Sequence, residues 1–180
     1  GLHTKGNGEG WRTTQLDDGE ALMKRKPGTF EFTSLPNLGF EKGRKISFKG
    51  DIGCLGVHPR SYTIMMTKDY GQNWIKALSY DTAKSLLEVP RLWSVHVVDS
   101  LETLVGGFKI QSNAMLTDAV LKKTRDGGKT WRDIKLGQKS SWAIMDIKSY
   151  ARDFALALGD TNRIYVYRRP APPSCDLKLL

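Results

Sequence analysis

Cysteine and histidine are scarce in this chain, which limits the metal and redox chemistry that it can support. Only two cysteines occur among 180 residues, and Cys54 and Cys175 form no CxxC pair. They permit one disulfide without requiring it, and two separate thiols are the favoured alternative because Cys54 lies in an apolar run. The three histidines, His3, His58 and His96, have no metal-ligand spacing. We therefore predict no metal site, and cysteine usage leaves the compartment open.

The motifs that bind phosphates or carry a nucleophile are also lacking. There is no GxGxxG, no P-loop and no GxSxG, so the sequence predicts no cofactor and no catalytic residue. No apolar run approaches the roughly 20 residues of a transmembrane helix. Because the chain begins at Gly1 rather than Met, we expect a processed, cut or partial chain, and the lack of a signal peptide excludes nothing.

Acidic residues are outnumbered by basic ones. The 28 Lys and Arg against 19 Asp and Glu give a net charge of +9, which favours an acidic partner surface, nucleic acid or an anionic membrane. Scattered, solvated lysines are the alternative, since the densest run is only 24–26. Nucleic-acid binding has little further support because most aromatics are expected in the core, and only Trp11 has no place there.

The residue composition of the chain changes twice along its length. Residues 1–26 are polar and glycine-rich without periodicity, which predicts a flexible basic arm. Residues 170–180 form a proline-rich tail. Between them, short β-type runs alternate with Gly, Pro, Asn and Asp, which is typical of an all-β protein. The one helical competitor is 81–89, where a loop with a single helical turn is the alternative.

The β-type runs recur with a period of roughly 50 residues, four runs to a period, which is the pattern of a β-propeller blade. The third unit has only three runs, and we expect 29–33 to supply its fourth strand. The predicted blades cover about 45–80, 93–136 and 142–168 within a propeller region at 27–169. The predicted strands are 45–48, 52–57, 62–66 and 74–79, then 93–98, 103–108, 119–123 and 131–134, then 142–148, 154–158 and 163–167.

An eight-residue turn motif, Thr-x-Asp-x-Gly-x-x-Trp, occurs twice between the third and fourth runs of a unit. The Thr and Asp oxygens can hydrogen-bond the turn backbone, Gly supplies a positive φ, and Trp can cover the hairpin. The motif residues are Thr67, Asp69, Gly71 and Trp74, and then Thr124, Asp126, Gly128 and Trp131.

This motif resembles the Asp-box, or BNR repeat, of sialidases, sortilin-type receptor ectodomains and a photosystem assembly factor. The resemblance implies an all-β propeller, or part of one, in which these residues are structural and lie away from the ligand-binding end. It also favours a secreted, lumenal or periplasmic location. The ligand-binding end would be built by other loops, whose candidate residues are His58, Arg60, Tyr80, Lys84, Arg91, Lys109, Asn113 and Lys139.

The expected function is a non-enzymatic scaffold for protein–protein interaction or complex assembly. The alternative is a carbohydrate-binding or sialidase-like glycosidase fragment, and the third hypothesis is an electrostatic nucleic-acid binder. A glycosidase needs two carboxylates at a defined separation, for which Asp81 with Glu88 or Asp118 is a conceivable pair. The Phe-Arg-Ile-Pro-like stretch typical of sialidases is lacking.

The number of predicted blades bears on partners. Three blades fall short of the four to eight of a closed propeller, and an open arc exposes apolar faces. We therefore expect the chain to belong to a longer polypeptide, to dimerise into a six-bladed ring, or to dock against another protein. The alternative is that the first 44 residues or the tail contain a fourth blade.

Overall fold

A computed structural model describes residues 2–16, 19–34, 43–57, 63–80, 89–110, 117–136, 142–151, 154–160 and 163–168. The described residues form fifteen strands and no helix, so the all-β prediction is confirmed. The segment 81–88, which held the possible helical turn, and the tail at 170–180 lie outside the described residues.

The strands form four antiparallel sheets, each following the chain order. We call them the first to fourth sheets. The first contains β1 (Leu2–Thr4), β2 (Gly10–Leu16), β3 (Gly19–Arg25) and β4 (Phe32–Ser34), and the second contains β5 (Gly43–Lys49), β6 (Ile52–Val57), β7 (Thr63–Thr67) and β8 (Ile75–Ser79). The third contains β9 (Arg91–Val97), β10 (Thr103–Ile110), β11 (Thr117–Thr124) and β12 (Arg132–Asp133), and the fourth contains β13 (Ile144–Ala151), β14 (Phe154–Gly159) and β15 (Ile164–Arg168).

The first sheet corrects two predictions. Residues 1–26 were expected to form a flexible arm, but β1, β2 and β3 lie within them. The segment 29–33 was expected to complete the last blade, but β4 pairs with β3, with Phe32 opposite Arg25. The structure therefore agrees with the alternative that the N-terminal residues contain a further sheet.

Trp11 explains why such a polar segment forms strands. Its side chain is fully buried, and its ring stacks on Phe48 of β5 with centroids 6.0 Å apart. The indole Nε1 donates a hydrogen bond to the carbonyl oxygen of Tyr70 at 3.2 Å. The tryptophan that the sequence left without a role therefore joins the first sheet to the second.

Trp142, expected to pack in a core, is instead 55% exposed.

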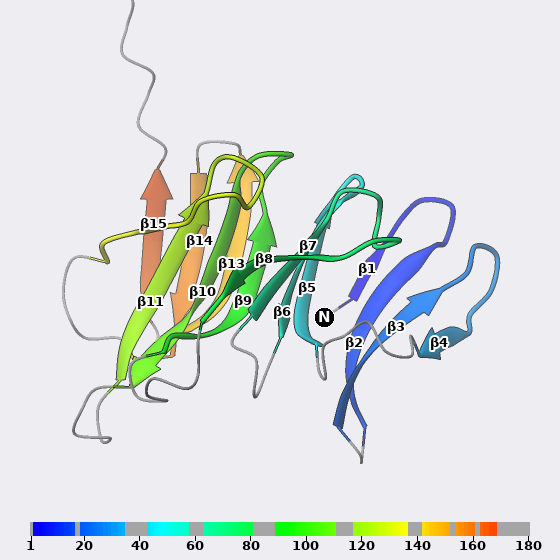
Figure 1. Cartoon of the computed structure of the whole chain (residues 1–180), viewed down its shortest axis with the longest axis horizontal. Helices are drawn as coiled ribbons and strands as arrows, with labels where there is room; N and C mark the ends of the chain where they lie inside the picture. Colours follow the sequence, from blue (N-terminus) through cyan, green and yellow to red (C-terminus); the bar gives the residue numbers. More distant parts are fainter. Residues whose placement is uncertain are drawn as a thin grey trace, which may run out of the picture.

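The four sheets lie side by side in chain order, with the first and fourth at opposite ends of the molecule (Figure 1). The apolar core consists of three clusters, each between two successive sheets. The first cluster joins Trp11 and Leu22 to Ile46, Phe48, Leu55, Val57, Met65 and Tyr70; the second joins Cys54, Ile64 and Met66 to Leu92, Val95, Val97 and Val105; the third joins Leu104 and Leu121 to Ile144, Ile147, Ala155 and Ala157. Each sheet is thus stabilised mainly by its immediate neighbours.

Close approach of the fourth sheet to the third depends on the missing side chain of Gly106. Ile144 of β13 lies directly over Gly106 of β10, and a Cβ added at Gly106 would lie 2.6 Å from Ile144 Cγ2. Such a contact cannot be accommodated without displacing the fourth sheet. Gly106 therefore allows the fourth sheet to pack closely on the third.

Candidate functional site

The first Thr-x-Asp-x-Gly-x-x-Trp motif forms a closed hydrogen-bond network between β7 and β8. Thr67 Oγ1 donates to Asp69 Oδ1 at 2.6 Å and accepts the backbone N–H of Gly71 at 2.8 Å. Asp69 Oδ1 also accepts the backbone N–H of Asn73 at 2.9 Å, and Asp69 Oδ2 accepts Asn73 Nδ2 at 2.7 Å. The turn thus satisfies its own polar groups.

The second motif, between β11 and β12, repeats this network with one change of donor. Thr124 Oγ1 donates to Asp126 Oδ1 at 2.7 Å and accepts the N–H of Gly128 at 2.9 Å. Thr130 takes the place of Asn73, since its backbone N–H and its hydroxyl both donate to the Asp126 carboxylate. Equal spacing in the sequence has produced equal geometry.

Hydrogen bonding keeps both carboxylates ionised. The backbone N–H of Asn73 and the hydroxyl of Thr67 lower the pKa of Asp69 to about 2. The hydroxyl and backbone N–H of Thr130 likewise lower the pKa of Asp126. A carboxylate with these partners is unsuited to donate a proton near neutral pH.

Each turn also packs on the preceding sheet. A Cβ added at Gly71 would collide with the Trp11 ring of the first sheet, and one at Gly128 would lie 2.6 Å from Met66 Sδ of the second. Trp131 Nε1 donates to the carbonyl oxygen of Ala77 in β8 at 3.1 Å. The turns therefore hold neighbouring sheets together as well as closing hairpins.

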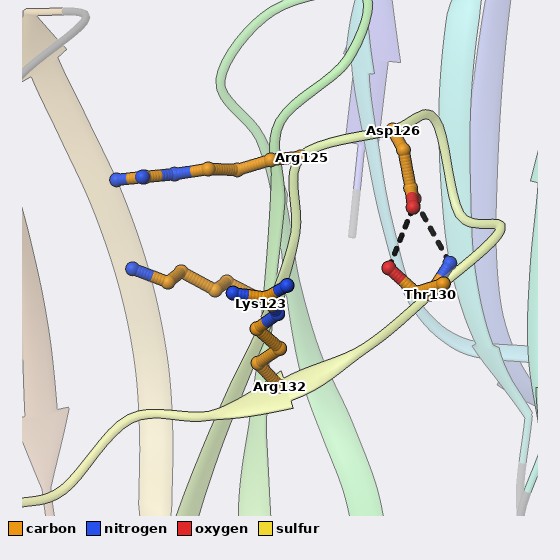
Figure 2. A pocket seen from close by; sticks show the side chains of 5 residues that line it. All are labelled: Lys123, Arg125, Asp126, Thr130 and Arg132. Atoms are coloured by element: carbon orange, nitrogen blue, oxygen red, sulfur yellow. Dashed lines mark hydrogen bonds between the residues drawn. The ribbon is translucent and has the colours of Figure 1, made fainter.

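A cationic pocket with a volume of about 260 Å³ lies beside the second turn. Lys123 and Arg125 come from the end of β11 and the start of the turn, and Arg132 comes from β12. Figure 2 shows Lys123 and Arg125 extending in the same direction, whereas Asp126 points to Thr130. Three cations line the pocket against one carboxylate engaged within the turn, and Arg125 also pairs with the buried Glu102, with Nε and Oε1 3.7 Å apart. The remaining excess of positive charge makes the pocket suitable for an anion.

Tyr167 of β15 holds two of these cations in place. Arg125 Nη2 donates to the Tyr167 hydroxyl at 2.9 Å, and Lys123 Nζ donates to it at 3.2 Å. The hydroxyl itself donates to Glu102 Oε1 at 3.0 Å, and Glu102 is almost completely buried. The hydrogen bond from Arg125 to Tyr167 is the main reason why the pKa of Arg125 is raised. Arg132, by contrast, is exposed at the surface.

The predicted ligand-binding residues are mostly not tested by the structure. His58, Arg60, Lys84, Asn113 and Lys139 lie outside the described residues. The other three, Tyr80, Arg91 and Lys109, lie just after β8, at the start of β9 and near the end of β10.

These three described residues have different surroundings. Tyr80 is half-buried against the cluster between the second and third sheets, and burial raises the pKa of its phenol. Arg91 lies over the ring of Phe108 at 5.4 Å, and Lys109 is exposed. The cationic pocket is lined by none of the three, and their role in binding remains a prediction.

The cationic pocket was not predicted. The signal available in the sequence was the hairpin predicted around the second motif, since residues directly opposite on paired strands, here Lys123 and Arg132, share a face. The contribution of Tyr167 could not be found in this way, because Tyr167 is distant from Arg125 in the sequence. The two residues meet only because the fourth sheet packs on the third.

Other classes of site have no support in the part of the chain that the structure describes. No group of three or more His, Cys, Asp or Glu is arranged to hold a metal ion there. None of its segments forms a helix long and apolar enough to cross a membrane. Cys54 is a buried free thiol whose pKa is raised by burial, and Cys175 lies outside the described residues.

No protein-family model matches the chain. No curated protein matches it either. Among solved structures, the chain is similar to YCF48 bound to D1 peptide, with a TM-score of 0.58 and 18% identity over 95% of this chain and 51% of that one. The fold is that of a β-propeller. YCF48 from Cyanidioschyzon merolae gives a TM-score of 0.62 and 14% identity over 94% of this chain and 50% of that one.

A chain in the nidogen/laminin complex is also similar, with a TM-score of 0.56 and 11% identity over 89% of this chain and 60% of that one. The chain therefore spans only about half the length of the YCF48 chains that it matches. With four sheets side by side and its two end sheets apart, it forms part of a propeller.

Proposed function

We propose that this chain is a non-enzymatic β-propeller module that binds a protein partner during complex assembly, and that its cationic pocket receives carboxylates of an acidic segment of that partner. The main support is the convergence of Lys123, Arg125 and Arg132 on one small cavity. A structural neighbour, YCF48, is bound to D1 peptide, so a protein with this fold takes up a peptide.

The size and chemistry of the pocket favour a side chain over a larger ligand. Its volume of about 260 Å³ is below the range of roughly 300–1,000 Å³ typical of small-molecule sites. Guanidinium groups bind carboxylates in a forked, two-bond geometry, and two of the three cations here are arginines. Because Tyr167 holds Arg125 in place, less side-chain entropy is lost when an anion binds.

We further infer that the two turns are Asp-boxes with a structural role. Both contain Thr, Asp, Gly and Trp at the same spacing, and both make the same hydrogen bonds. In this proposal the Asp69 and Asp126 carboxylates organise turns and perform no chemistry. The loop-end residues Tyr80, Arg91 and Lys109 provide a second contact area for the partner.

Binding of a short fluorescein-labelled peptide rich in Asp and Glu, measured by anisotropy, tests the pocket. Its Asn- and Gln-containing counterpart is the control ligand. We expect Arg132→Glu to weaken binding about tenfold, equal to about 1.4 kcal/mol, since it removes one charge contact and introduces a repulsion. Lys129→Glu makes the same charge change on an exposed residue of the same turn that does not line the pocket.

The two variants distinguish a site from a general charge effect. If Lys129→Glu weakens binding as much as Arg132→Glu, the protein attracts acidic peptides only through its net charge and the pocket proposal is wrong. Equal binding of the neutral peptide would also contradict it. Hydrolysis of a fluorogenic sialoside by the wild type would instead favour the glycosidase alternative.

A further inference from the structure

The fourth sheet has an exposed apolar face at one end of the molecule. Ala155, Ala157, Tyr165 and Tyr167 pack against the third sheet, so the alternating residues of β14 and β15 point the opposite way. Those residues are Leu156, Leu158, Ile164 and Val166. Ile164 is 63% exposed and Val166 is 55% exposed. Four aliphatic side chains therefore share a face that no described sheet covers.

The corresponding positions in the second sheet are covered by another sheet. Strand register pairs Leu156 with Val166 and Leu158 with Ile164 in the fourth sheet. In the second sheet, Cys54 pairs with Met66 and Gly56 with Ile64 in the same pattern. Cys54, Met66 and Ile64 are buried beneath the third sheet.

The third sheet repeats the arrangement, with Leu104 and Leu121 buried beneath the fourth sheet. At each of the three contacts between successive sheets, the first strand of the later sheet (β5, β9 or β13) covers one side of the earlier sheet. The covering strands of the third and fourth sheets present aliphatic side chains, which are Val95 and Val97 on β9 and Ile144 and Ile147 on β13.

The first sheet has no preceding sheet to pack against among the described residues. In the second and third sheets, the turn before the last strand leads to Trp74 and Trp131, which pack into the clusters shared with the preceding sheet. In the first sheet the turn before β4 contains Phe30, which is 94% exposed. Leu2 of β1 is also exposed, whereas its neighbour His3 lies against Phe48 of the second sheet.

We propose that two copies of this chain assemble head to tail, with the fourth sheet of each copy packed on β1 and the β3–β4 turn of the other. Two such contacts related by a two-fold axis close a ring, so no apolar end face is left uncovered. A ring of two four-sheet chains has eight sheets, within the usual range of four to eight blades.

This assembly does not depend on the cationic pocket. The fourth sheet contributes aliphatic side chains, and the first sheet contributes Leu2 and Phe30 beside the exposed Arg12. Because apolar side chains are present on both sides, we expect the self-association to persist as the salt concentration rises. Binding of an acidic peptide to the pocket should weaken under the same conditions. The two proposals can therefore fail separately.

Sedimentation equilibrium of the full chain, over a concentration series, tests the assembly. We expect a species of twice the chain mass of 20.2 kDa at high concentration. The double variant Ile164→Glu/Val166→Glu and the single variant Phe30→Glu should each shift the protein to monomer. Ile75→Glu is the matched control, because Ile75 is similarly exposed but lies on β8, away from both end faces.

Three outcomes would overturn the proposal. A wild-type monomer at every concentration excludes self-association. A dimer that survives Phe30→Glu but not Ile164→Glu/Val166→Glu indicates a symmetric contact between fourth sheets. Open-ended oligomers of increasing mass indicate that the ends meet without closing. In each case another occupant, such as further blades or a different protein, must cover the face.

Hydrogen exchange on the wild type keeps the proposal testable if a variant fails to fold. The amides of 163–168 and 26–31 should exchange more slowly as the concentration passes through the dimerisation range. Those of 75–79 should not change. Exchange that is independent of concentration in all three segments would contradict the proposal.

Discussion

Replacing Trp11 by alanine tests whether the first sheet is an integral part of the fold. The Trp11 side chain is fully buried, contacts Phe48, Tyr70 and Trp74, and donates a hydrogen bond to the Tyr70 carbonyl. A buried tryptophan removes roughly 150–250 Å² from water, equal to about 4–6 kcal/mol at about 25 cal/mol per Å². Because unfolded chains already bury part of this surface, we expect a loss of about 3–5 kcal/mol.

The loss should be local, because each sheet contacts only its neighbours. Native-state hydrogen exchange followed by mass spectrometry separates a local loss from a global one. In Trp11→Ala, the amides of the first sheet should exchange about a hundred to a few thousand times faster, since each 1.4 kcal/mol is a factor of about ten. Those of the third and fourth sheets should change by less than about threefold, which is about 0.6 kcal/mol.

Trp142→Ala is the matched control for this experiment. It removes the same side chain from a site that is 55% exposed, so we expect a loss below about 1 kcal/mol. Unchanged exchange of 2–34 in Trp11→Ala would mean that these residues are not held by the second sheet. Equal acceleration of all four sheets would mean that the molecule unfolds as one unit.

Three further predictions concern single polar groups. Thr124→Val should lower the free energy of unfolding by about 1–3 kcal/mol in urea titrations, because the buried Gly128 N–H loses its acceptor, while Thr124→Ser should retain most of the stability. Burial lowers the pKa of His96 to about 4 from 6.5, so the unfolded chain binds a proton at this residue before the folded chain does. The contribution of neutral His96 to the free energy of unfolding is therefore complete above pH 6.5 and is lost as the pH falls through about 4. Relative to His96→Gln, the wild type should therefore lose about 1–2 kcal/mol of stability between these pH values, allowing for partial exposure; an equal pH dependence would contradict this. Tyr167→Phe removes a donor to the buried Glu102 and should cost about 1–3 kcal/mol, and an unchanged midpoint would show that this network adds no stability.

Most strands in the last three sheets could be predicted because their alternation and turn residues are local signals. The prediction 52–57 coincides with β6, and the predictions for β7 to β11 differ from the observed ends by no more than two residues. The identical networks around Thr67 and Thr124 also follow from local spacing.

The first sheet could not be predicted in the same way. Polar residues and glycine outnumber apolar residues in strands β2 and β3, so the apolar content of these strands alone does not predict that they fold. Their stability comes from the packing of Trp11 against Phe48, a partner supplied by the second sheet. The assignment of 29–33 to the last blade failed for a related reason, because register with β3 is decided by the turn after Arg25.

The site shows the same division. Lys123 and Arg132 lie opposite each other because β11 and β12 form a hairpin around the second motif, and Arg125 follows β11 directly, all of which the sequence contains. The fixation of Lys123 and Arg125 by Tyr167 arises only when the fourth sheet packs on the third.

Taken by itself, the sequence determined the strands, the turns and the repeating antiparallel sheet, since these depend on side chains a few residues apart. The tertiary structure alone decided that the N-terminal residues form a sheet, that Tyr167 holds Lys123 and Arg125, and which apolar faces are left uncovered. Those features depend on contacts between sheets, for which alternation and spacing along the chain contain no information.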